Sequence, residues 1–331
     1  MTIPAAPPPL GEFERIARFF APLAAPGALG LRDDIALIDG PAGEQYALTT
    51  DAIVAGVDYF PDDPPFMIAQ KLLRVNLSDL AAKGAVPFGY LLTTALPESC
   101  GESWLAEFSA GLAADQKQFG LALLGGDSSA IPGPALLSAT LIGRVARGTA
   151  ILRSGARDGD WVYVSGTLGD AALGLAVRKG EVASGLDPAA RDYLVERYRL
   201  PRPRVTLGQR LVGIAHAMID ISDGLVADLG HLCAASKLGA IVREPDIPLS
   251  PAARAALVAN PRLNAAVTGG GDDYELLFSA PAAAADAIAQ AAGACGVAIA
   301  AIGAMGQGEG VTLLDAAGQP ITVEHAGYAH F

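Results

Sequence analysis

The chain has 331 residues, of which 51% are apolar and 18% are charged, and its formal net charge is −12. This apolar fraction excludes a disordered chain, and the length favours two domains over one. The acidic charge argues against binding to a phosphate backbone, so we expect no nucleic-acid partner. A phosphate-bearing ligand remains compatible if divalent cations lie between it and the acidic side chains.

The N-terminal part predicts a leader followed by helices and strands. Residues 1–10 are rich in Pro and Ala, lack the basic and apolar regions of a signal peptide, and are interpreted as a disordered leader. Apolar spacing predicts a helix over 11–22 and two short strands over 45–50 and 53–57, with Asp51 between them. A proline pair opens a long helix over 64–85, which places Asn76 and Asp79 on one face.

The remaining elements predict an α/β fold with mixed sheets in two domains. Strands over 88–95, 121–124 and 135–145 surround a helix over 102–118 and complete a first domain, residues 11–149. The second domain, residues 150–331, alternates helices with strands. Its helices are expected over 170–178, 189–197 and 205–216 and from Leu225 onward, and its strands over 161–165, 217–221, 275–278 and 297–302. Glycines at 306, 308 and 310 predict a hairpin turn before a strand over 311–314.

Several residue types suggest no site of their own. The most apolar stretch, 281–305, contains Asp286 and several glycines and predicts a helix followed by a strand, so we expect no membrane span. Three widely separated cysteines are interpreted as reduced core residues of a cytoplasmic protein. The histidines have no metal-ligand spacing, and His216 and His231 are expected on helix surfaces without a role.

The informative pattern is a set of small or apolar segments that end abruptly in aspartate. They are Asp33-Asp34, Thr49-Thr50-Asp51, Asp79 after Asn76-Leu77-Ser78, Gly125-Gly126-Asp127, Asp220-Ile221-Ser222-Asp223-Gly224 and Gly269-Gly270-Gly271-Asp272-Asp273-Tyr274-Glu275. Each could be only a turn or a helix cap. Together they predict one crevice, because loop residues at strand ends of an α/β protein collect where ligands bind.

Such a cluster of carboxylates requires cations. Two carboxylates about 4 Å apart repel by roughly 4 kcal/mol at an effective dielectric constant near 20. Mg²⁺ is the natural partner, since it prefers hard oxygen ligands and completes its octahedron with water and substrate phosphates. The sequence lacks a Gly-x-x-x-x-Gly-Lys-[Ser/Thr] loop, a His-Glu-x-x-His motif and a Gly-x-Ser-x-Gly elbow. The pattern therefore predicts a site in which magnesium ions hold a phosphate-bearing ligand.

Read in order, these motifs resemble those of the thiamine-monophosphate kinase family, within the ATP-binding superfamily of aminoimidazole ribonucleotide synthetase and selenophosphate synthetase. The resemblance runs from Gly11 to Tyr328, and its most specific motifs are Thr49-Thr50-Asp51, Asn76-Leu77-Ser78-Asp79-Leu80-Ala81-Ala82, Asp220-Ile221-Ser222-Asp223-Gly224-Leu225 and Asp273-Tyr274-Glu275-Leu276. It implies an aminoimidazole ribonucleotide synthetase-like architecture and a homodimer joined through the N-terminal domains. It also implies transfer of the γ-phosphoryl group of ATP onto the phosphate of thiamine monophosphate, without a protein nucleophile.

The resemblance also implies roles for individual residues. The residues implied to bind Mg²⁺ are Asp34, Thr49, Thr50, Asp51, Asp79, Asp127, Asp220 and Asp223. The residues implied to contact ATP are Gly126, Asp127, Arg153 and Ser222, and those implied to contact the acceptor are Asp58, Asp272 and Tyr328.

Three positions depart from the family pattern. Arg32 replaces a usual glycine, Asp58 a usual histidine and Asp272 a usual glutamate. The last two lie where the acceptor is expected, and Asp58 exchanges a possible hydrogen-bond donor for an acceptor. Two alternatives therefore stay open: an enzyme of the same superfamily with another acceptor, and a regulator that binds MgATP without turnover.

Overall fold

The computed structural model describes residues 14, 16–182, 185–322 and 327. The expected leader, residues 1–10, and Tyr328 lie outside these residues. The expected helix over 11–22 is described only from its later part, where short helical turns η1 (Ile16–Phe20) and η2 (Ala21–Leu23) precede η3 (Pro26–Leu31).

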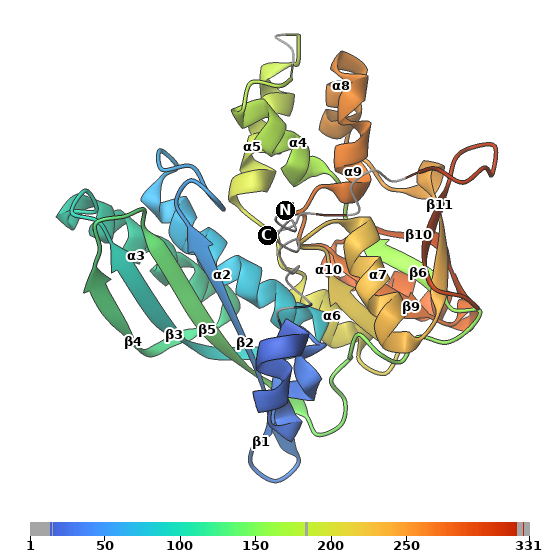
Figure 1. Cartoon of the computed structure of the whole chain (residues 1–331), viewed down its shortest axis with the longest axis horizontal. Coiled ribbons are helices and arrows are strands. Elements are labelled where there is room, and N and C mark those ends of the chain that lie inside the picture. The colour runs from blue at the N-terminus through green and yellow to red at the C-terminus, as the bar shows by residue number, and fades with distance from the viewer. Residues whose placement is uncertain (1–13, 15, 183–184, 323–326, 328–331) are drawn as a thin grey trace, which may run out of the picture.

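The N-terminal domain contains a mixed sheet covered on one face by helices (Figure 1). Within the described residues its strand order is β1-β2-β5-β3-β4, antiparallel except for the parallel pair β3 and β4. The strands are β1 (Ala36–Asp39), β2 (Glu44–Val54), β3 (Val86–Leu96), β4 (Ala122–Ala130) and β5 (Leu136–Ala146). Helix α3 (Glu102–Phe119) makes the crossover that a parallel strand pair needs.

Two strand predictions in this domain were wrong in their bounds. The segment 45–50 and the first two residues of 53–57 belong to the single strand β2, which ends at Val54, so Asp51 lies inside a strand and not between two. The strand expected over 121–124 continues to Ala130 and includes Gly126 and Asp127. A Cβ atom at Gly126 would lie 1.9 Å from the carbonyl oxygen of Leu92, so only glycine lets the two strands approach there.

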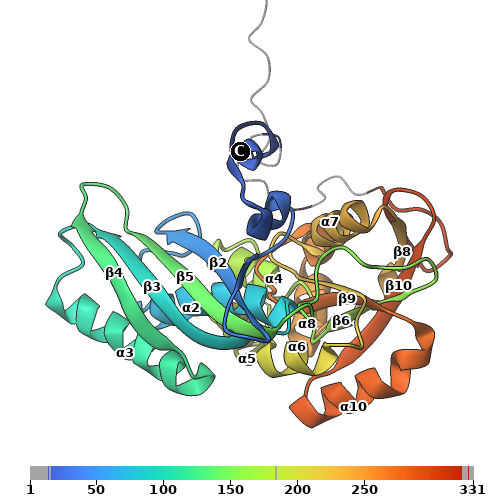
Figure 2. The same ribbon diagram turned by 90° about the horizontal axis from the view of Figure 1, so that it is seen from below.

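The C-terminal domain is a second sheet between two helical layers (Figure 2). In the described part of the chain its order is β11-β8-β10-β6-β9-β7, antiparallel except for β8 with β11. The strands are β6 (Trp161–Ser165), β7 (Ala217–Asp220), β8 (Gly239–Arg243), β9 (Leu276–Ala280), β10 (Ile299–Gly306) and β11 (Gly310–Leu314). Helix α7 (Leu225–Ser236) covers one face, and α6 (Val205–Leu211) and α10 (Ala285–Cys295) lie on the other.

Further helices stand beside this sheet and form a small cluster of their own. They are α4 (Asp170–Arg178), α5 (Pro188–Arg199), α8 (Pro251–Ala259) and α9 (Ala265–Gly269), with the short turn η5 (Pro261–Asn264). The short turns η4 (Glu244–Asp246) and η6 (Ala282–Ala284) contact β10 and α10 instead. A separate apolar core joins α4, α5 and α8. None of the helices that the structure describes is long and apolar enough to cross a membrane.

Two predictions for the C-terminal domain were wrong. The helix expected over 205–216 ends at Leu211, and His216 directly precedes β7, where its Nδ1 atom lies 2.8 Å from an oxygen of Asp160. The hairpin expected at 306–310 does not form, because β8 lies between β10 and β11 in the sheet. The α/β class with two mixed sheets is confirmed.

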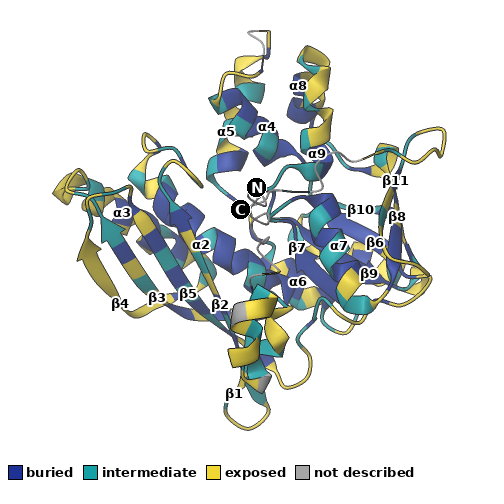
Figure 3. Cartoon of the chain, in the orientation of Figure 1, coloured by how far each residue is buried: buried dark blue, intermediate teal, exposed yellow. Residues whose placement is uncertain are grey.

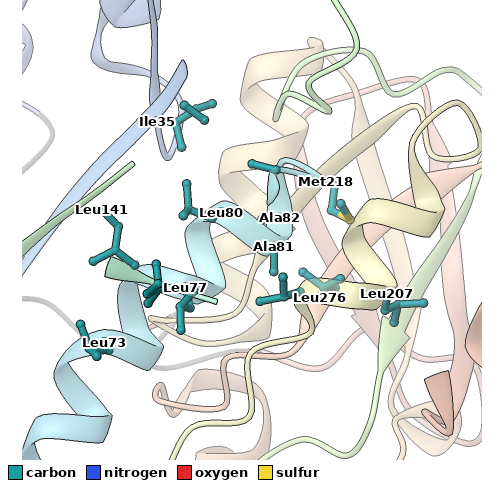
Figure 4. Packing of buried hydrophobic residues seen from close by; sticks show 14 of the residues in the cluster. Ile35, Leu73, Leu77, Leu80, Ala81, Ala82, Leu141, Leu207, Met218 and Leu276 are labelled. Carbon is teal, nitrogen blue, oxygen red and sulfur yellow. The ribbon is translucent and has the colours of Figure 1, made fainter. Parts of the chain in front are cut away.

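Helix α2 (Pro65–Ala82) is the central element of the molecule, since it contacts both sheets. Apolar residues occur around its whole circumference, which is typical of a buried helix. Leu77 lies beside Leu141 of β5, while Ala81 lies beside Leu276 of β9 in the C-terminal domain (Figure 4). In Figure 3 this helix is largely dark blue and the edge strand β4 is yellow. Any polar side chain on α2 is therefore forced into the interior.

Candidate active site

A cavity of about 570 Å³ lies between the two domains. The N-terminal domain lines it with the middle of β2 and with one face of α2. The C-terminal domain lines it with α4, with residues 222–223 after β7, and with the loop 269–274 before β9. The acidic motifs found in the sequence thus meet mainly at one place.

Three aspartates from different segments converge at the wall of this cavity, where Asp34 and Asp79 line it and Asp220 is buried beside them. Asp34 precedes β1, Asp79 lies on α2 and Asp220 ends β7. Each offers a carboxylate oxygen, and these oxygens all lie within 4.8 Å of one another. This arrangement has the hard oxygen donors and the spacing that a divalent cation requires.

Burial and mutual repulsion disfavour the charged state of these carboxylates. Burial raises the pKa of Asp220 to about 7 and that of the neighbouring Asp51 to about 6. The pKa of Asp79 is raised well above its usual range, first by burial and then by the charges of Asp51 and Asp220. A bound cation would remove this penalty, because it favours the ionised form of every carboxylate around it. On this donor chemistry, Mg²⁺ fits the site.

Strand β2 and helix α2 are joined by hydrogen bonds at the cluster. The hydroxyl of Thr49 donates to Asp79, and the backbone N–H of Asp51 donates to the side-chain oxygen of Asn76 at 3.0 Å. Asn76 in turn donates to the carbonyl of Leu72 one turn earlier. Asn76 therefore fixes Asp51 relative to Asp79. Thr50 also borders the cavity. Its hydroxyl donates a hydrogen bond to the carbonyl oxygen of Ala139 on β5.

Two basic side chains contact the edge of the aspartate cluster. The Nε atom of Arg153 lies 2.7 Å from one oxygen of Asp34, and its backbone N–H donates to Asp33. Lys83 forms an ion pair with the other oxygen of Asp34 and contacts Asp33 at 2.9 Å. Sequence patterns singled out Arg153 but missed Lys83, although residues 75, 79 and 83 follow one helical face at a spacing of four.

A second group with metal-binding geometry involves the turn after β7. Oxygens of Asp223 and Asp228 and a ring nitrogen of His231 lie within 4.8 Å of one another. Asp228 accepts hydrogen bonds from the backbone N–H groups of Asp223 and Gly224, which shapes the start of α7. His231 was predicted to be a surface residue without a role, and the structure instead places it in this half-buried group.

The opposite end of the cavity combines carboxylates, an ammonium group and an aromatic ring. The Nζ atom of Lys71 contacts Asp272 at 3.0 Å and the carbonyl of Asp58 at 2.8 Å, and it lies 4.2 Å from the ring centre of Tyr198. The carboxylate of Asp58 accepts a hydrogen bond from the N–H of Val54. Sequence reasoning identified Asp58 and Asp272 but missed the lysine and the tyrosine between them.

The motif 272–275 points alternate residues in opposite directions. Asp272 and Tyr274 border the cavity, whereas Asp273 and Glu275 are fully buried behind it. Asp273 accepts hydrogen bonds from the N–H groups of Gly169 and Ala171. The backbone of Asp272 and Tyr274 has φ values of 71° and 51°, a conformation that non-glycine residues adopt only when their surroundings enforce it.

Arginines enforce this conformation by binding Glu275. Arg204 contacts both carboxylate oxygens of Glu275, at 2.5 and 2.6 Å, and Arg197 lies 3.2 Å from one of them. Ser165 donates to the same carboxylate. Glu275 is therefore a support of the cavity wall.

Two predicted site residues do not reach this cavity. Gly126 and Asp127 lie on the edge strand β4, and β3 and β5 separate them from β2. Neighbouring strands are about 4.8 Å apart, so Asp127 is roughly 14 Å from the same level of β2. The predicted substrate residue Tyr328 lies outside the described residues, while its neighbour Gly327 borders the cavity.

Comparisons with known proteins relate this site to a family. The chain matches the family model "AIR synthase related protein, N-terminal domain" over residues 32–145 and "AIR synthase related protein, C-terminal domain" over 157–315. The thiamine-monophosphate kinase of Caulobacter vibrioides is 41% identical over 99% of this chain and 92% of its own length. That of Escherichia coli K12 is 40% identical over 97% of this chain and 98% of its own.

Solved structures show the same relationship. The crystal structure of thiamine-monophosphate kinase from Stenotrophomonas maltophilia K279a is 41% identical, with a TM-score of 0.77 over 92% of this chain and 96% of that one. The structure of AaThiL complexed with AMPPCP and TMP is 30% identical, with a TM-score of 0.84 over 97% of each chain.

Proposed function

The chain belongs to the thiamine-monophosphate kinase family, and we propose that its aspartate cluster holds the Mg²⁺ ions with which it transfers a phosphoryl group. The reaction is transfer of the γ-phosphoryl group of ATP to the phosphate of thiamine monophosphate, which gives thiamine diphosphate and ADP. The observation that carries the metal proposal is the convergence of Asp34, Asp79 and Asp220, with oxygens within 4.8 Å of one another, beside Asp51.

The ligand set follows from the position of each oxygen donor. We assign Asp51, Asp79 and Asp220 to the central ions, with Thr49 and Thr50 as neutral neighbours on β2. Asp223, together with Asp228 and His231, offers a second position 4.8 Å or less across. Bound Mg²⁺ supplies charge neutralisation for the phosphates, and the protein supplies alignment, which is most of what phosphoryl transfer requires.

Helix α2 orders the two substrates along the cavity. Lys71, Val75 and Asp79 border it in succession, so its two ends are separated by about 12 Å along the helix axis. The aspartate end suits the metal-bound phosphates of ATP, with Arg153 and Ser222 beside them. The other end suits the cationic thiazolium ring of the acceptor, whose phosphate would then point toward the metals.

The end of the cavity that we assign to thiamine monophosphate accounts for an aspartate at position 58 in place of the usual histidine. Its carboxylate accepts a hydrogen bond from the backbone N–H of Val54. Its backbone carbonyl oxygen accepts hydrogen bonds from the Nζ atom of Lys71 and from the hydroxyl of Tyr198. Asp58 thus contributes negative potential and a fixed loop, both of which favour a cationic ring and oppose a phosphate. The small side chains Ala171 and Ala172 leave room for a flat ring beside Tyr198.

We further propose a homodimer in which β4 completes the site of the other subunit. The N-terminal sheet exposes apolar side chains of β3 and β4, namely Val86, Phe88, Leu91, Leu123 and Leu124. Exposed apolar strands of this kind are typical of an interface. Because Asp127 cannot reach the cavity of its own chain, we assign it, with Gly126, to ATP and metal binding in the cavity of the partner subunit.

Mixed dimers test this shared site. D127N and D79N should each be inactive, whereas a statistical mixture of the two chains should recover about a quarter of the wild-type activity, since half of the dimers regain one of their two sites. A mixture that stays inactive while heterodimers are shown by mass spectrometry would place Asp127 outside catalysis.

The activity itself is tested with purified protein, MgATP and thiamine monophosphate, followed by phosphorus NMR. We expect a diphosphate resonance that requires Mg²⁺ and disappears with EDTA. ATP binding without ADP formation would indicate a regulator, and ADP formation only with another acceptor would indicate a different enzyme of the superfamily. We propose a cytoplasmic location, where Cys100, Cys233 and Cys295 stay reduced, as they are in the structure.

A further inference from the structure

A lysine ammonium group is buried beneath the aspartate cluster. The side chain of Lys83 has no exposed surface, and those of Asp33 and Asp34 are 6% and 2% exposed. Its Nζ atom contacts Asp33 at 2.9 Å, Asp34, and the carbonyl oxygen of Met218 at 3.0 Å. An ammonium group has three hydrogen-bond donors, so these three oxygens satisfy it completely.

These contacts place a side-chain cation against each oxygen of Asp34. One oxygen accepts a hydrogen bond from the Nε atom of Arg153 at 2.7 Å, and the other forms an ion pair with Lys83. Asp34 is expected to be a metal ligand from the family resemblance, and a Mg²⁺ ion that binds it would share its oxygens with these two cations. Asp51 and Asp79 have no ion pair to a lysine or arginine among the residues that the structure describes. The carboxylates that pair with a lysine or arginine thus lie apart from Asp51 and Asp79, which do not.

Lys83 also connects the segments that carry the metal ligands. It lies one turn after Asp79 on α2, and Met218 lies two residues before Asp220 on β7. The same ammonium group therefore fixes the end of α2, the strand β7 and the loop of Asp33 and Asp34. No other described side chain contacts all three segments through a single charged atom.

We propose that Lys83 is a built-in cation, which occupies the position beside Asp33 and Asp34 that a divalent ion would otherwise have to fill. A covalently attached cation is present before any metal binds, so this part of the cluster is neutralised in the metal-free protein. Mg²⁺ is then needed chiefly to balance the charges of Asp51, Asp79, Asp220 and Asp223. This inference rests on the proposed magnesium site and assigns Lys83 a positioning role in it.

The test compares K83M with R74M. Arg74 lies on the same helix and makes a bidentate pair with the fully buried Asp115, and neither residue lines the cavity. Both variants break a buried ion pair, so both should lower the melting temperature in EDTA by roughly 5–10 °C. With Mg²⁺ added to all three proteins, the difference in melting temperature from the wild type should shrink by more than half in K83M, where the ion can enter beside Asp33 and Asp34, and stay unchanged in R74M.

Counting bound ions gives an independent readout. Mn²⁺ titration followed by electron paramagnetic resonance should find one more bound ion per chain in K83M than in the wild type. If K83M does not fold in EDTA, folding on addition of Mg²⁺ supports the proposal. If K83M does not fold even with Mg²⁺, the same measurements are made on K83Q, whose side-chain amide keeps a hydrogen-bond donor for the carbonyl oxygen of Met218.

The outcomes separate this inference from the proposed function. Equal Mg²⁺-dependent stabilisation of K83M and R74M, with an unchanged Mn²⁺ count, would overturn the role of Lys83 while leaving the kinase intact. A wild-type protein that gains no stability from Mg²⁺ and a non-hydrolysable ATP analogue, and forms no diphosphate, would instead overturn the metal site itself.

Discussion

Two buried groups of charges lie on either side of the loop 272–274, and they differ in how their charge is balanced. Around Glu275, buried arginines bind the carboxylate directly, and Ser165 completes the contacts. Around Asp79, neighbouring aspartates raise one another's pKa, and hydroxyl and amide groups are the main partners. The charges of the first group are balanced within the chain, and those of the second group are balanced only when ligands bind.

This difference separates the support from the site. A buried carboxylate paired with arginine stabilises one arrangement of the chain and has no need of a further cation. A buried carboxylate beside other carboxylates stores repulsion, which a metal ion relieves on binding. Both groups arise from the acidic motifs of the sequence, one around Asp79 and one around Glu275. The partner of each acidic residue therefore decides its role.

The sharpest test of the comparison is D79N. We expect kcat to fall by about a thousandfold or more, because the substitution removes a central metal ligand from the transition-state environment. The melting temperature in EDTA should not fall, since one of several mutually repelling charges is removed. Steady-state kinetics and calorimetry on the same preparation check both statements.

Asp115 provides the matched control for this prediction. It is also a fully buried aspartate, but Arg74 and Gln70 bind it between α2 and α3. D115N should lower the melting temperature and leave kcat within a factor of two or so of the wild type at low temperature, the reverse of D79N. If D79N destabilised the protein as much as D115N, Asp79 would belong to the support.

The next effect in size is the loss of stability in E275Q. This substitution keeps the volume of the side chain but leaves Arg204 without its anion and Arg197 with only the more distant Asp170, at 3.9 Å, which should lower the free energy of unfolding by about 3–5 kcal/mol. Denaturant unfolding measures this loss. Activity at low temperature should stay within tenfold of the wild type, and a thousandfold loss in a folded variant would mean that Glu275 acts in the chemistry.

The sequence predicted much of the cavity because its acidic motifs are local signals. Asp34, Asp51, Asp79 and Asp220 each follow or interrupt a small or apolar run, and the packing of β2, α2 and the end of β7 brings these residues together. Lys71 and Lys83 gave no comparable signal. Their polar ends matter only because α2 is buried on every side, which follows from the packing of two domains and not from the helix alone.

Other errors have equally specific physical causes. Asp127 follows a glycine pair and resembles the other acidic residues, but its position in the sheet order removes it from its own cavity, and strand order is not visible in a local pattern. The glycines at 306–310 suggested a hairpin because β10 and β11 are adjacent in sequence. The intervening strand β8 comes from a distant segment that sequence periodicity did not reveal.

A smaller effect is expected at the acceptor end, where charges are partly balanced. Lys71 holds Asp272, the carbonyl of Asp58 and the ring of Tyr198 in place. K71M should raise KM for thiamine monophosphate by about tenfold, the equivalent of 1.4 kcal/mol, and leave KM for ATP within a factor of two or so. K71R should show an intermediate value, since it keeps the charge. Equal changes in both KM values would place Lys71 at the nucleotide.

The smallest effect should appear where a carboxylate is paired but not buried. Arg178 contacts both Asp62 and Asp63, whose side chains are 74% and 3% exposed. Water already solvates Asp62, so D62N should leave the melting temperature unchanged within error, as for most exposed ion pairs. D63N should lower it measurably, because Asp63 also binds Arg199 at 2.6 Å in a buried position. Equal effects of the two substitutions would mean that pairing alone, without burial, decides which carboxylates support this fold.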